Sequence, residues 1–103
     1  MGKNRVIKIL GNIVGNIAVH KILIKYTNKP ESITHLESEV ENYRDNTLEI
    51  ANKFNWSEKD KVEIKLKALK KFKKDMEKYY SDVKFPLKDV EKLIGETLEE
   101  IMS

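Results

Sequence analysis

The sequence predicts an all-α protein, a small up-down four-helix bundle. Three observations predict it: apolar residues repeat at helical spacing in four stretches, capping or helix-breaking residues separate the stretches, and the net charge changes sign between them. Charged side chains give +6 over residues 1–29, −4 over 30–56, +4 over 57–80 and −3 over 81–103. Neighbouring helices of opposite sign attract each other in such a bundle.

The composition fits one compact domain. The chain has 103 residues, 40% hydrophobic and 36% charged, which is too apolar for a disordered chain and too short for two ordinary domains. It contains no cysteine, so disulfides, thiolate catalysis and cysteine-ligated metals are excluded. We therefore expect residues 1–103 to form a single helical domain in the cytoplasm.

Residues 4–26 are mostly apolar, and their polar residues lie on one helical stripe. These polar residues recur at every fourth position, as Lys8, Asn12, Asn16 and His20. That spacing predicts a helix, because β-branched residues cost a helix little when packing stabilises it. The alternative is an α+β fold with a β-hairpin at residues 5–26, turning at residues 11–12 and packed on three helices.

Capping signals precede the second and third helices. Thr34 and Glu37 are expected to form a capping box, and Ser57 with Asp60 another cap. The apolar face of the third helix is expected to comprise Val62, Leu66, Leu69, Phe72, Met76, Tyr79 and Tyr80.

The fourth helix is expected after residues 81–85. Pro86 suits its first position, and apolar residues continue at helical spacing as far as Ile101. Short loops between the helices make consecutive helices antiparallel, which gives the up-down order.

The first helix has more apolar surface than one core-facing side needs. Either the other three helices wrap it, or its surplus face meets a second copy in a homodimer. Gly11 and Gly15 are spaced so that another helix can approach closely. The candidate self-association residues are Gly11, Gly15, Ile17 and Ile22.

Two stripes of like charge are candidate binding surfaces. The acidic stripe of the second helix, a candidate surface for a basic partner, is Glu37, Glu41, Asp45 and Glu49. The lysine stripe of the third helix, a candidate surface for nucleic acid or an acidic partner, is Lys67, Lys70, Lys71, Lys74 and Lys78. The alternative for both stripes is that they only keep the protein soluble or pair with each other.

Residues 48–66 resemble the helix-turn-helix of many DNA-binding regulators. Ala51 matches the helix crossing, Asn55 the turn and Ser57 the cap of the reading helix. The sequence departs from that pattern because the following helix is about twice too long for a recognition helix. The resemblance implies base contacts from Glu58, Lys59 and Lys61.

The chain lacks the residue patterns of an enzyme. It has two histidines, His20 and His35, and no phosphate-binding glycine loop or recognisable catalytic triad. We expect no cofactor, metal or small-molecule substrate, and no membrane span because polar residues interrupt the first helix. The sequence favours a non-enzymatic protein–protein interaction or assembly module, and the alternative is a nucleic-acid-binding protein.

Overall fold

The protein is all-α, as the sequence predicts. The computed structural model describes residues 2–26 and 33–102, without the side chains of residues 33–36, 44 and 46. The helices are α1 (Lys3–Tyr26), α2 (Ile33–Ala51), α3 (Glu58–Tyr79) and α4 (Leu87–Met102). No strand occurs in the described ranges, so the hairpin alternative is wrong. The proposed cap at residues 34–37 lies partly outside the described side chains.

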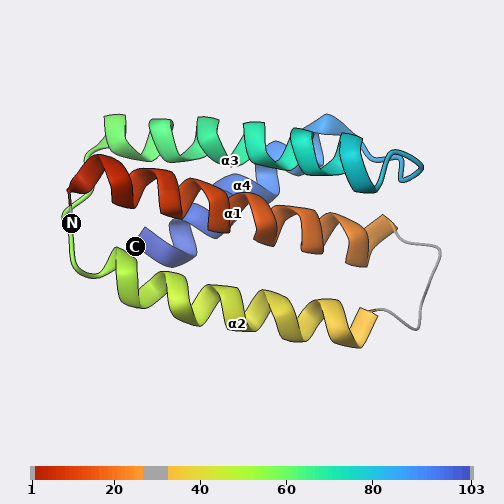
Figure 1. The fold of residues 1–103 in the computed structure, drawn as a ribbon, viewed down its shortest axis with the longest axis horizontal. Coiled ribbons are helices and arrows are strands. Elements are labelled where there is room, and N and C mark those ends of the chain that lie inside the picture. The colour runs from red at the N-terminus through yellow and green to blue at the C-terminus, as the bar shows by residue number, and fades with distance from the viewer. Residues whose placement is uncertain (1, 27–32, 103) are drawn as a thin grey trace.

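The helix α1 lies at the centre of the fold. It has α3 on one flank and α2 on the other, and α4 crosses behind it (Figure 1). Eleven of its residues are buried, which accounts for the surplus apolar surface seen in the sequence. These residues are Val6, Ile7, Leu10, Gly11, Val14, Gly15, Ile17, Ala18, Val19, Ile22 and Leu23.

The two glycines of α1 bring α3 into close contact. A Cβ atom built on Gly11 would lie 2.6 Å from the Cβ of Lys67, and one on Gly15 would lie 2.8 Å from the Cβ of Lys71. The backbone carbonyl oxygen of Ala68 lies 2.9 Å from the same point at Gly15. Only glycine leaves room for the two helices at this separation.

The candidate self-association residues therefore belong to the core of one chain. Gly11 and Gly15 pack against α3, and Ile17 and Ile22 are no more than 1% exposed. A self-association surface made of these four residues is wrong for this fold, because the other three helices already cover them. Self-association through another face stays a prediction.

The buried face of α3 is rotated from the face that the apolar spacing predicts. Its buried residues are Ile64, Ala68, Phe72 and Met76. The expected core residues Val62 and Leu66 are instead 54% and 62% exposed. The cause is the contact with α1, since Ala68 must face the small residues Gly11 and Gly15 for the helices to pack.

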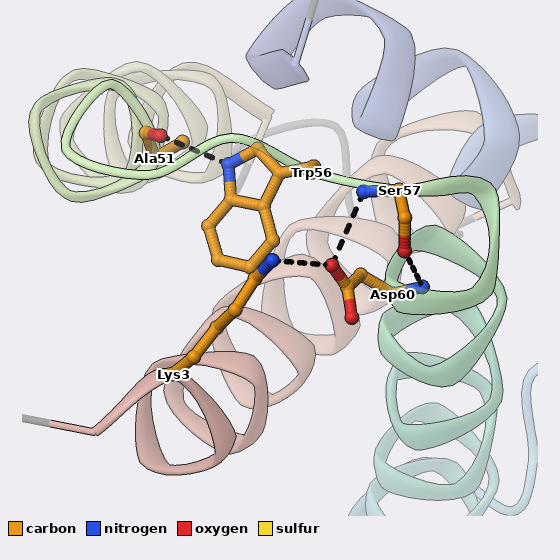
Figure 2. A network of polar contacts seen from close by, with 5 residues as sticks. All are labelled: Lys3, Ala51, Trp56, Ser57 and Asp60. Atoms are coloured by element: carbon orange, nitrogen blue, oxygen red, sulfur yellow. Dashed lines mark hydrogen bonds and ion pairs between the residues drawn. The ribbon is translucent and has the colours of Figure 1, made fainter.

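Polar contacts tie the start of α3 to the first turn of α1. The predicted cap is present, with the Ser57 hydroxyl accepting a hydrogen bond from the Asp60 amide while the Asp60 carboxylate accepts one from the Ser57 amide. The Lys3 ammonium lies 2.7 Å from that carboxylate and 5.4 Å from the centre of the Trp56 ring (Figure 2). The Trp56 indole N–H donates to the carbonyl of Ala51 at 2.9 Å. These contacts fix the α2–α3 turn against α1.

A second polar cluster joins the end of α1 to α4. The Asp89 carboxylate accepts hydrogen bonds from the Lys25 ammonium at 2.8 Å and from the Tyr26 hydroxyl. Because both donors stabilise the charged carboxylate, they hold the pKa of Asp89 below its usual value of 3.8, the Lys25 contact having the larger effect.

The lowered pKa predicts a loss of stability in acid. A carboxylate whose pKa is lower in the folded than in the unfolded state stabilises the fold above its usual pKa and ceases to do so as the pH falls through the folded value. We expect the difference in free energy of unfolding between wild type and Asp89→Asn to be largest near neutral pH and to shrink below about pH 4. Urea unfolding at several pH values measures it. A difference that is constant with pH would show that the Asp89 carboxylate contributes nothing as a charge.

Candidate functional site

The lysine stripe lies on the surface of α3. Four of its members, Lys67, Lys70, Lys74 and Lys78, are exposed, and Lys71 is half-buried. Lys71 pairs with Asp75 at 3.1 Å, and the Lys78 ammonium lies 5.1 Å from the centre of the Tyr79 ring. Within the described part of the chain, Lys67, Lys70 and Lys74 form no ion pair, so their charges are free to bind an anion.

The glycine contact places the lysine stripe beside the polar stripe of α1. Lys67 packs on Gly11, which Lys8 precedes by three residues and Asn12 follows directly. Lys8 and Asn12 are exposed, and helical phase puts them on the side of α1 opposite α4. The same phase puts Lys67 and Lys74 on the corresponding side of α3. The two stripes therefore form one surface.

We call this surface the basic seam. Its members come from two helices that run side by side in the same direction (Figure 1). They are Arg5, Lys8, Asn12 and Asn16 from α1 and Lys67, Lys70, Lys71 and Lys74 from α3. No acidic residue occurs in α1, and α3 has six lysines and no acidic residue over positions 64–74. The exposed Glu63 lies one turn before Lys67, and Asp75 pairs with Lys71, so the seam is mainly positive over several helical turns with a carboxylate near each end of its lysines.

The acidic stripe faces away from the basic seam. All four of its residues are exposed, whereas Val40, Thr47 and Ala51 on the opposite side of α2 are buried. Because α2 and α3 lie on opposite flanks of α1, the two stripes do not pair with each other within the chain (Figure 1). The carboxylates of the acidic stripe are therefore on another helix, across α1 from the lysines of the seam.

The structure does not form a helix-turn-helix at residues 48–66. In that motif two helices pack against each other across a turn of three or four residues. Here α2 and α3 are separated by α1, and six residues join them. Lys61, one of the implied base-contacting residues, is half-buried and pairs with Glu58 at 3.5 Å. This departure shows that the resemblance was to local sequence only.

His20 links α1 to α2. Its imidazole contacts the Glu39 carboxylate, its Nδ1 lies 2.7 Å from the carbonyl oxygen of Asn16, and its ring stacks edge-on against Tyr43 at 5.5 Å. The side chain of His35 lies outside the described residues. Among the described side chains, no group of three or more potential metal ligands comes together.

Comparisons with protein-family models, with curated proteins and with solved structures found no match to this chain. In the described ranges, α1 is the one helix that is long and apolar enough by composition to cross a membrane. More than half of its most apolar segment is buried inside the fold, and the central helix of a globular protein has the same composition.

Proposed function

We propose that the protein is a non-catalytic binding module that holds the phosphate backbone of a nucleic acid on the basic seam. The observation that carries the proposal is that the close contact at Gly11 and Gly15 brings the polar stripe of α1 beside the lysine stripe of α3. Gly11 packs against Lys67 and Gly15 against Lys71, so the side of α1 that carries Lys8 and Asn12 lies beside these lysines of α3. A cluster in which cations outnumber carboxylates attracts the phosphate backbone of a nucleic acid.

Two structural findings favour nucleic acid over a protein partner at this surface. Most of the apolar surface of α1, which favoured protein association, is buried by packing within the chain. The acidic stripe, which would repel phosphates, is exposed on α2, and α1 lies between α2 and α3 (Figure 1). The exposed side chains of the seam are lysine, arginine and asparagine, so the seam offers charge and hydrogen bonds but no apolar contact to a protein.

The chemistry of the seam indicates weak binding without sequence preference. Lysine acts as a point charge and lacks the two-pronged hydrogen bonding with which arginine reads guanine. The lysine stripe extends over residues 67–78, about 16 Å at 1.5 Å per residue, which is enough for a few phosphates. We therefore expect dissociation constants of about 1–100 μM near physiological salt, similar for RNA and DNA.

Charge reversal in the seam tests the proposal. We expect Lys67→Glu, Lys70→Glu and Lys74→Glu together to weaken binding to random single-stranded RNA and random duplex DNA by about 100-fold at low salt. Fluorescence anisotropy at two salt concentrations measures both the affinity and its salt dependence. Since each phosphate contact contributes about 0.7–0.9 to the slope of log affinity against log salt, the slope should fall by about 2–3.

A control variant separates the seam from overall charge. The changes Lys65→Glu, Lys73→Glu and Lys88→Glu alter the net charge equally but lie outside the seam, so binding should fall much less. Undetectable binding of the wild-type protein at low salt would refute nucleic-acid binding. Equal losses in the two triple variants would show that the seam has no special role.

A further inference from the structure

The outer side of α3 exposes two aliphatic side chains that the fold does not use. Val62 is 54% exposed and Leu66, one turn later, is 62% exposed. Leu69, half-buried, continues the same side of the helix. We call these three residues the aliphatic ridge. Helical phase places Val62 and Leu66 opposite Ala68 and Ile64, and so on the side of α3 turned away from α1.

Exposed lysines flank the aliphatic ridge. Lys70, which the ridge shares with the edge of the basic seam, follows Leu66 by one turn, Lys73 follows Leu69 by one turn, and Lys65 precedes Leu69 by one turn. All three lysines are exposed. Glu63 is the exposed acidic residue within the ridge segment, so the surface keeps a positive balance. The ridge therefore combines apolar contact with positive charge.

We propose that the aliphatic ridge docks an acidic amphipathic helix of a partner protein. The apolar side of that helix covers Val62 and Leu66, and its carboxylates reach the surrounding lysines. Helices bind in this way by placing apolar residues at helical spacing on an apolar strip. Opposite charges around the strip add selectivity and speed association.

Two other occupants fit the ridge poorly. A phosphate backbone gains nothing from covering leucine and valine, whereas the basic seam offers it charge without apolar surface. A second copy that packs its own α3 on the ridge brings lysines against lysines. A second copy that presents α2 offers carboxylates, and the exposed side chains described on that helix include Ser38 and Asn42 but no aliphatic one.

A designed peptide tests the proposal directly. The probe is a synthetic helix of three Leu/Glu heptads, and oligoglutamate of the same length serves as a probe with charge alone. We expect the Leu/Glu peptide to bind at least about tenfold more tightly than oligoglutamate, measured by anisotropy of the labelled peptides.

Substitutions in the ridge locate the binding surface. The pair Val62→Ser and Leu66→Ser should weaken binding of the Leu/Glu peptide by about tenfold or more and leave random-RNA binding unchanged. Leu87→Ser is the matched control. Leu87 is 50% exposed but lies on α4, outside the ridge, so this change should leave peptide binding unaltered. The single change Leu66→Ser should give part of the loss.

Three results would overturn the proposal. Oligoglutamate that binds as tightly as the Leu/Glu peptide would show that apolar contact is unnecessary. Peptide binding that survives the double substitution would place the surface elsewhere. Sedimentation that shows self-association of the wild-type protein, abolished by the double substitution, would make the ridge a contact between copies.

Discussion

Gly15→Ala is expected to destabilise the fold by about 1–3 kcal/mol, the cost of overfilling a packed contact. In an open helix the same substitution stabilises by about 0.5–1 kcal/mol, because alanine loses less backbone entropy than glycine. At Gly15 the new methyl group would lie 2.8 Å from the Cβ and Cγ of Lys71 and 2.9 Å from the carbonyl oxygen of Ala68. That carbonyl belongs to the backbone of α3, so α3 itself must move away from α1.

Gly95 provides a matched control in the same protein. It lies inside α4, and a Cβ atom there would have nothing within 4 Å. Gly95→Ala should therefore raise the free energy of unfolding by about 0.5–1 kcal/mol. Urea unfolding should therefore show a lower free energy of unfolding for Gly15→Ala and a higher one for Gly95→Ala, although both changes add the same methyl group. A Gly15→Ala variant as stable as wild type would contradict the close α1–α3 contact.

The number and order of the helices could be predicted because their signals are local. Polar residues every fourth position from Lys8 to His20 indicate a helix, and α1 covers that whole segment. The cap formed by Ser57 and Asp60 was predicted, because its two hydrogen bonds join residues three apart. Such features depend on a few neighbouring residues and not on the tertiary arrangement.

The position of the basic seam could be predicted only in part. The lysine stripe and the polar stripe of α1 are both visible in the sequence, as is the Gly11–Gly15 spacing that favours close packing. The sequence does not say which helix approaches the two glycines. The alternation of charge suggested that α2 and α3 pair with each other, whereas α1 separates them. The seam forms because α3, and not another helix, packs against the two glycines of α1. No local sequence pattern specifies that pairing.

The side of α3 that faces the core could not be predicted either, because it also depends on which helix packs against α3. The segment has apolar residues on more of its circumference than it buries, so Val62 and Leu66 compete with Ile64 and Ala68 for the core. Counting large apolar residues favours the first pair. The structure selects the second pair, because a small residue at position 68 lets α3 approach the glycines of α1. The excess apolar surface left outside is the aliphatic ridge.

Aspartate substitutions at Ile64 and Leu66 should reveal that rotation in solution. Ile64 is fully buried, so Ile64→Asp places a carboxylate without a partner in the core and should cost at least about 4 kcal/mol, enough to unfold a small domain. Leu66 is 62% exposed, so Leu66→Asp should change the free energy of unfolding by no more than about 0.5 kcal/mol. Circular dichroism and urea unfolding compare the two variants under identical conditions. The apolar spacing of the sequence alone predicts the opposite order, with Leu66 in the core. Loss of folding in Leu66→Asp together with a stable Ile64→Asp would restore that order and remove the basis of the aliphatic ridge.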